Sequence, residues 1–271
     1  MKQTAALPEP LAARPLEFDG ARYVAASDHQ LEWGRGLISE LDLRGDEHIL
    51  DLGCGDGRLT AQLADLVPRG LVIGLDASSS MLRQARQHAR ANLRFLRQDL
   101  NQIDLAPEFN VIFSNAALHW VKDHARLLAR VFQGLRVGGR ARFSFGGAGN
   151  CPTFNLTAQT VMELPRFRAQ FAGFDWPWFF PSAEEYRRVA AEIPFRHADV
   201  WLEVADRFFP NAEALIRWVD QPCLVPFLAR LDADQGVDYR QQVIGRMLRS
   251  SRQADGRCFE QFRRLHFHAR K

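Results

Sequence analysis

The sequence predicts an α/β fold built on a doubly wound, mostly parallel sheet of seven strands. Between residues 48 and 145, short apolar runs alternate with amphipathic segments, as in parallel strands joined by crossover helices. Glycines 53, 55 and 57 directly follow the first apolar run, which is typical of a strand, a tight turn and a helix start. The segment 264–270 alternates in character and predicts a final strand, antiparallel and at or near an edge.

The individual elements follow from the same periodicities. Apolar residues at mostly helical spacing, among them Leu31 and Leu37, predict a helix over about 28–42. The strand at 48–52 then leads into a helix at 57–67, which carries Leu59, Leu63 and Leu66 at helical spacing. Strands are expected at 71–76, 93–97, 109–114 and 139–145, with helices at 78–90 and 123–135 between them. After Gly149, residues 152–192 are aromatic and helical in pattern, a strand is expected at 197–205, and 211–252 indicate further helices.

Composition excludes several classes of protein. The 271 residues are 46% hydrophobic and 25% charged, which is ordinary for a globular chain. The 35 basic and 32 acidic residues are scattered, so we expect no nucleic-acid partner. The four cysteines are widely spaced without a CxxC pair, which argues against a metal site and favours a reducing cytoplasm. No apolar run approaches about 18 residues, so no membrane span is expected.

The glycine turn indicates a nucleotide-like cofactor. Glycine lacks a Cβ and tolerates positive φ, so a cofactor can lie directly on the backbone. Asp76 ends the second strand, where a ribose-binding carboxylate belongs. A dinucleotide fingerprint requires its third glycine at position 58, where Arg58 stands, and no tyrosine has a lysine four residues on. A nicotinamide oxidoreductase is therefore the alternative interpretation, beside a close-packed turn without a ligand.

Five segments between residues 48 and 145 resemble the motifs of class I S-adenosylmethionine (SAM)-dependent methyltransferases. They are Asp51-Leu-Gly-Cys-Gly-Asp-Gly57, Gly74-Leu-Asp-Ala-Ser-Ser-Ser-Met-Leu82, Phe95-Leu-Arg-Gln-Asp-Leu100, Phe109-Asn-Val-Ile-Phe-Ser-Asn-Ala-Ala-Leu-His-Trp120 and Leu135-Arg-Val-Gly-Gly139. Three further segments resemble the trans-aconitate, juvenile hormone acid and malonyl-carrier-protein methyltransferase group: Tyr23…Gln30-Leu-Glu-Trp-Gly34, the 116–120 loop and the 255–264 run. Asn110 departs from the aspartate usual in the family.

The resemblance implies a SAM site on the glycine turn. Asp51 is expected near the methionine amino group, and Asp76 is expected to accept both ribose hydroxyls, because a carboxylate offers only acceptors. Asp76 as a helix N-cap and Met81 as core filler are the structural alternatives. The residues expected to bind SAM are Gln30, Asp51, Gly53, Cys54, Gly55, Asp76, Ala77, Met81, Asp99, Leu100 and Asn115.

The acceptor is expected beyond the fourth strand, where open α/β sheets bind ligands. His119 would position the acceptor, or act as a base toward a hydroxyl or amine; a structural histidine is the alternative. His124 is expected on a helix surface. Arg217, Arg263 and Arg264 are candidates to grip an acidic acceptor. The residues expected at the acceptor are Tyr23, His119, Trp120, Trp218 and Arg263.

The resemblance as a whole implies a SAM-dependent methyltransferase of a small, acidic molecule, with O-methylation of a carboxylate. A non-catalytic binding module of the same fold is a further alternative. We expect a leader over 1–27, a Rossmann-like SAM-binding core over 28–149, and a helical substrate lid plus the last sheet strands over 150–271. The protein is expected to be a cytoplasmic monomer or weak homodimer.

Overall fold

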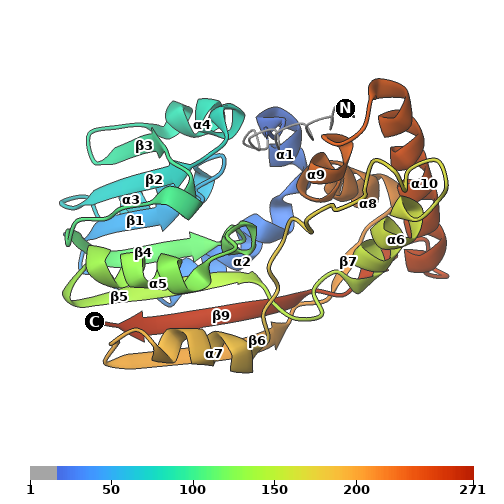
Figure 1. Ribbon diagram of the computed structural model, residues 1–271. Helices are drawn as coiled ribbons and strands as arrows, with labels where there is room; N and C mark the ends of the chain where they lie inside the picture. The colour runs from blue at the N-terminus through green and yellow to red at the C-terminus, as the bar shows by residue number, and fades with distance from the viewer. Residues whose placement is uncertain (1–16) are drawn as a thin grey trace, which may run out of the picture.

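The computed structural model describes residues 17–271, and its central feature is the predicted seven-stranded sheet (Figure 1). The strand order is β3-β2-β1-β4-β5-β9-β6, with β1 to β5 parallel and β9 antiparallel to both its neighbours. The strands are β1 His48–Leu52, β2 Leu71–Asp76, β3 Leu93–Arg97, β4 Phe109–Asn115, β5 Leu135–Gly146, β6 His197–Val204 and β9 Arg263–Arg270. The predicted fold class is therefore confirmed.

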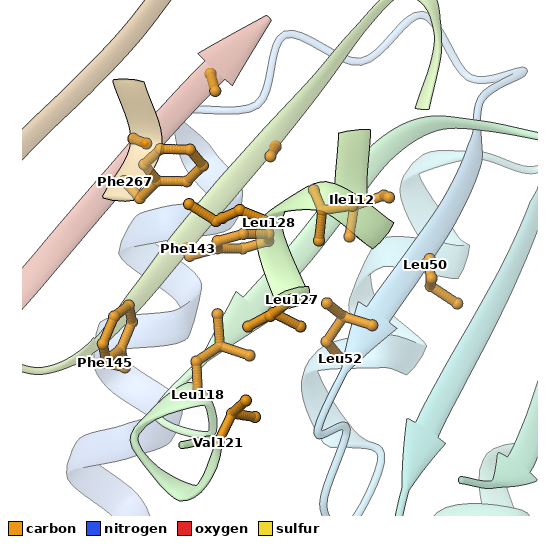
Figure 2. Close-up of a cluster of buried hydrophobic side chains, with 14 of the residues drawn as sticks. Leu50, Leu52, Ile112, Leu118, Val121, Leu127, Leu128, Phe143, Phe145 and Phe267 are labelled. Carbon is orange, nitrogen blue, oxygen red and sulfur yellow. The ribbon is translucent and has the colours of Figure 1, made fainter. Parts of the chain in front are cut away.

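Helices cover both faces of this sheet, each over its own hydrophobic cluster. One face packs against α2 (Asp28–Ser39), α3 (Arg58–Leu66) and α4 (Ser79–Ala85). The other packs against α5 (His124–Gly134) and α7 (Ala183–Ala191), around Leu50, Ile112, Leu128 and Phe143 (Figure 2). Both clusters are apolar because β1 and β4 are buried on their two faces, as parallel sheet strands require.

A separate group of helices lies beyond the carboxyl ends of the parallel strands (Figure 1). It contains α6 (Pro152–Met162), α8 (Ala212–Trp218), a π-helical turn at Val219–Cys223, α9 (Val225–Leu228) and α10 (Ala233–Ser251). Two short strands, β7 (Arg207–Phe209) and β8 (Cys258–Glu260), pair with each other at its base. Aromatic rings form its core, and most rings that the sequence places in 152–192 are buried there or pack against it partly exposed.

The structure departs from the predicted elements in three segments of the chain. The predicted helix at 78–90 ends at Ala85 and continues only as a 3₁₀ turn. Residues 152–192 are helical only in α6 and α7, since Pro165, Gly173 and Pro177 interrupt the segment between them. α1 (Gly20–Ala26) forms inside the expected leader, where no helix was predicted, whereas residues 1–16 lie outside the described part of the chain.

The end of the sheet matches its prediction. β9 lies one place from the edge strand β6 and pairs along its whole length with both β5 and β6. The pairing places Arg264 opposite Gly146, at the end of β5 from which the chain enters the helical group. Within residues 17–271, no helix has the length and apolar character needed to cross a membrane.

Candidate functional site

A cavity of about 420 Å³ lies between the carboxyl ends of the strands and the helical group. The strand order reverses between β1 and β4, and open α/β sheets bind ligands outside the strand ends at this reversal. One part of the cavity is lined by the glycine turn after β1 and by the ends of β2, β3 and β4. The other part is lined by α2, the 119–120 loop, the start of α6 and the start of β9.

The glycine turn lines the first part of the cavity. Gly53 and Gly55 have φ values of 75° and 56°, which favour glycine, and a Cβ on Gly53 would lie 2.2 Å from the Ala117 Cβ. The N–H groups of Gly53 and Cys54 donate to the Leu75 carbonyl. The Gly55 N–H donates to Asp76 Oδ2 at 2.9 Å. These amides are already bonded within the protein, so the turn offers a ligand a surface free of side chains rather than free donors.

Asp76 sits at the end of β2 with its carboxylate aimed at the turn. Its Oδ1 accepts from the Ser78 N–H at 2.9 Å, in addition to the bond from Gly55. The N-cap of α4 is Ser78, whose hydroxyl accepts from Met81 N–H, so Asp76 is not the cap. Burial raises the pKa of Asp76, and the two amide donors oppose that rise. The carboxylate is thus held in one orientation at the cavity wall.

Two further carboxyl groups, Asp51 and Asp56, line this part of the cavity. Asp51 is fully buried at the end of β1 and accepts from Thr60 Oγ1 at 2.7 Å. Burial raises the pKa of Asp51 to about 7. Asp56 pairs with Arg58, whose Nη2 also donates to Ser27 Oγ and so joins the turn to the start of α2. A cationic ligand bound beside these carboxylates would stabilise their ionised forms, which burial away from water destabilises.

Arg264 is a cationic side chain in the second part of the cavity. Its Nε donates to Ser144 Oγ at 2.8 Å and its Nη2 donates to Asn115 Oδ1 at 2.8 Å. Its guanidinium carbon lies 4.3 Å from the centre of the Trp33 ring. The Nη1 group is buried and has no hydrogen-bond partner among the described residues. Burial lowers the pKa of Arg264 to about 9, so the side chain remains cationic at pH 7.

Aromatic rings enclose the space in front of Arg264. Trp120, Trp178 and Phe180 contact one another, with ring centroids 5.6 Å apart for the two tryptophans and 5.8 Å for Trp178 and Phe180. The cavity lining also includes rings from α2, β5, α6, α8 and the segment before β9. These are Trp33, Phe145, Phe154, Trp218 and Phe262. Such a wall removes water and favours an apolar ligand surface.

The two histidines that line the cavity, His29 and His119, are partly buried and neutral at pH 7. Burial lowers the pKa values of His119 and His29 to about 3. The Nδ1 of His119 and the Nε2 of His29 have no partner among the described residues, and both side chains line the cavity. His124 was expected on a surface but is 3% exposed, and its ring nitrogens contact Tyr186 Oη and the Leu118 carbonyl. The expectation for His124 was wrong because α7 covers this face of α5.

The structure brings the eleven residues expected at SAM together in one cavity lining. Of the residues expected at the acceptor, Tyr23, His119, Trp120 and Trp218 also line the cavity. Arg263 does not: its guanidinium pairs with Asp206, and Arg264 takes the inward place. The correction follows from strand alternation, since neighbouring residues of β9 point to opposite faces of the sheet.

Sequence reasoning missed several residues of the lining. The loop before α6 contributes Asn150, the first turn of α6 contributes Phe154 and Asn155, and α2 contributes His29. No motif marks them, because a residue at the amino end of a helix in the lid is recognisable only after the lid is packed on the sheet. His29 could have been found from its place beside Gln30 in the leader motif.

Comparison with known proteins gives concordant results. Residues 49–139 match the family described as methyltransferase domain. A trans-aconitate 2-methyltransferase from Deinococcus radiodurans is 35% identical over 221 residues, which span 80% of this chain and 81% of that protein. One from Azoarcus sp. is 30% identical over 82% of this chain and 86% of its own length. Among solved structures, a putative methyltransferase from Bacillus halodurans shares the fold, with a TM-score of 0.60 and 16% identity over 88% of this chain and 98% of its own.

Proposed function

Because this chain belongs to the SAM-dependent methyltransferase family that includes the trans-aconitate 2-methyltransferases, we propose that it methylates a carboxylate oxygen of a small molecule. The product of that reaction is a methyl ester. The family assignment makes the protein an enzyme that uses SAM, and it replaces the nicotinamide oxidoreductase and the non-catalytic module as interpretations. The nature of the acceptor is the proposal, and the cavity supplies the arguments for it.

The first part of the cavity suits SAM. Gly53 and Gly55 present bare backbone in the cavity lining, and Asp76 presents a fixed carboxylate to a ribose. Asp51 lies where a methionine amino group is expected, and Met81 and Leu100 offer apolar contacts to an adenine. A positive charge of SAM bound beside Asp51 or Asp76 would favour their ionised forms, which burial disfavours. Bound SAM supplies the reactive methyl group on its cationic sulfur.

The observation that carries the proposal is the unpartnered Nη1 of Arg264. A buried N–H without a hydrogen-bond partner is costly, and a cationic one more so, unless a ligand completes it. Arg264 has no carboxylate partner among the described residues, whereas Arg263 beside it pairs with Asp206. A carboxylate is the group that a guanidinium binds best, since the two match in charge and planar geometry.

The remaining residues orient the acceptor and exclude water. A carboxylate is ionised at pH 7, so it needs no base to become a nucleophile. His119 is neutral and partly buried, and its part is to hold the acceptor in place. The rings of Trp120, Trp178 and Phe180 close the cavity, and a fixed, dry arrangement of the two reactants lowers the barrier by up to roughly 7–11 kcal/mol.

The experiment that tests this function distinguishes esters from other methylated products. The enzyme is incubated with methyl-labelled SAM and a set of small acids, alcohols and amines, and each product is treated with mild alkali. A methyl ester releases labelled methanol, whereas methyl ethers and methylamines keep their label. We expect alkali-labile label from the acids. Label that resists alkali, or appears only with alcohols or amines, would contradict the proposal.

Variants of two arginines sharpen the same test. Arg264→Met is expected to lower kcat/KM for the acids roughly 100-fold, because charged hydrogen bonds each contribute about 1.5–3 kcal/mol. Arg217→Met is the matched control, since Arg217 pairs with Glu213 on the surface of α8. The SAM dissociation constant is measured for both variants, because Arg264 also donates to Asn115. Equal activity of Arg264→Met and the control would remove Arg264 from the acceptor site.

A further inference from the structure

We infer that the acceptor carries a single carboxylate on an apolar body. This inference rests on the proposed carboxylate methylation and specifies its substrate class. It differs from the substrate named for the bacterial relatives, since trans-aconitate carries three carboxylates. The argument depends on how many charges the acceptor part of the cavity can accommodate and on what else lines it.

Among the described residues, the acceptor part of the cavity offers one cation, Arg264. Arg58 also lines the cavity but belongs to the glycine turn, where its guanidinium is bonded to Asp56 and Ser27. His29 and His119 are neutral, because burial and nearby arginines and histidines keep their pKa values near 3. A second or third carboxylate would therefore lose its water without gaining a counter-charge.

The arrangement of Arg264 further limits it to one carboxylate. Nε and Nη2 are bonded to Ser144 and Asn115, and one face of the guanidinium lies over the Trp33 ring. The unpartnered group is Nη1 alone. A side chain fixed on three sides presents one edge, which can receive one carboxylate group.

Asn155 opposes a second anion directly. Its Nδ2 donates to the Asn150 carbonyl at 2.8 Å, which fixes the orientation of the amide. Its Oδ1 is buried without a partner and belongs to the cavity lining. An unpartnered carbonyl oxygen repels a carboxylate and accepts from a hydroxyl or N–H group. The body of the acceptor can therefore carry a donor at this point, but not an anion.

Aromatic rings form a large share of the remaining wall. Trp120, Trp178 and Phe180 pack together on one side, and Phe154 contacts Trp178 at a ring-centroid distance of 5.9 Å. Aromatic walls contribute to binding by burying apolar surface and by ring packing. A polycarboxylate would cover these rings with charged groups, whereas an aryl or alkyl body buries them.

The test compares two classes of acid under the same conditions. One class holds trans-cinnamate, 4-phenylbutyrate and octanoate, and the other holds trans-aconitate and tricarballylate. With methyl-labelled SAM, we expect kcat/KM for the best monocarboxylate to exceed that for either tricarboxylate at least 100-fold. Binding to the enzyme loaded with S-adenosylhomocysteine, followed by calorimetry, gives a second readout with the same expected order.

The outcomes separate this inference from the function on which it rests. Equal or better use of the tricarboxylates, with alkali-labile product, overturns the inference and leaves carboxylate methylation intact. Label that resists alkali overturns both. If no acid is methylated, the binding order decides: failure of the monocarboxylates to bind better than the tricarboxylates overturns the inference.

A gain-of-charge variant tests the argument from charge independently. Asn155→Lys places a cation where the unpartnered Oδ1 of Asn155 now lies. We expect this substitution to lower the ratio of kcat/KM for monocarboxylates to kcat/KM for tricarboxylates at least tenfold. Asn155→Gln is the matched control, which keeps the amide without adding charge. Thermal unfolding of both variants verifies that they fold. An unchanged preference in a folded Asn155→Lys enzyme would show that charge at this wall does not set specificity.

Discussion

Replacing Asp76 by alanine is the sharpest test of the cofactor site. The carboxylate is expected to accept two hydroxyls of the SAM ribose, and a hydrogen bond to a charged group contributes about 1.5–3 kcal/mol. The loss of two such bonds, partly offset by hydrogen bonds to water, corresponds to about 3 kcal/mol. The SAM dissociation constant should then rise roughly 100-fold. Asp76→Asn keeps one acceptor oxygen and is expected to lie between the wild type and Asp76→Ala.

The same substitution has a smaller effect on folding. The N–H groups of Gly55 and Ser78 lose their acceptor, but removing a carboxylate whose pKa is raised by burial offsets part of that loss. We expect the free energy of unfolding to fall by no more than about 3 kcal/mol, so the variant remains folded at room temperature.

Calorimetric titration with SAM measures the effect, and urea unfolding measures stability. Asp104→Ala is the matched control, because the Asp104 side chain is 80% exposed and pairs only with Arg130 at the surface. The control is expected to match the wild type in both measurements. A dissociation constant for Asp76→Ala within threefold of the wild-type value would refute a role for Asp76 at the ribose.

Three further predictions concern the turn and the buried titratable groups. Gly53→Ala forces positive φ on alanine and brings its Cβ to 2.2 Å from that of Ala117, so urea unfolding should show a loss of about 2–5 kcal/mol; a loss below about 1 kcal/mol would contradict the geometry. Asp51 has a pKa of about 7, and a positively charged amino group bound beside it would lower that pKa. Calorimetry of SAM binding at pH 7, in two buffers of different ionisation enthalpy, should therefore detect the release of up to about half a proton. This proton release should disappear in Asp51→Asn. The pKa of His119 is about 3 in the folded protein and about 6.5 in the unfolded chain, so its stabilising contribution is complete above pH 6.5 and is lost as pH falls toward 3. Between pH 6 and 4, the free energy of unfolding of His119→Gln should therefore change less with pH than that of the wild type, by about 1.4 kcal/mol per pH unit. Equal slopes for the two proteins would argue against a neutral His119 in the folded protein.

The sheet could be predicted because its signals are local. β1 and β2 begin and end at the predicted residues, since each is a short apolar run bounded by polar residues or glycine. The carboxyl ends of parallel strands meet at one edge, and the family resemblance assigns Asp51, Asp76 and Asn115 to that edge, where the structure has them line one cavity.

The acceptor part of the cavity depends on information that is not local. The sequence shows two neighbouring arginines before the last strand, but which one faces inward depends on the register of β9 against β5. A shift of one residue would exchange Arg263 and Arg264. Likewise, the composition of 152–192 cannot distinguish rings that line the cavity, such as Trp178, from rings such as Phe167 that are buried in the helical group.

The position of β9 has a consequence for biosynthesis. This strand follows all the others in the chain, yet it is inserted between β5 and β6. The ribosome must therefore have released β9 before the gap in the sheet can close, and contacts across such long separations form slowly. Arg264 enters the pocket in that last step. The glycine turn and the first five strands can assemble early, whereas Arg264, for which we propose a role at the acceptor, joins the cavity only when synthesis has passed residue 264.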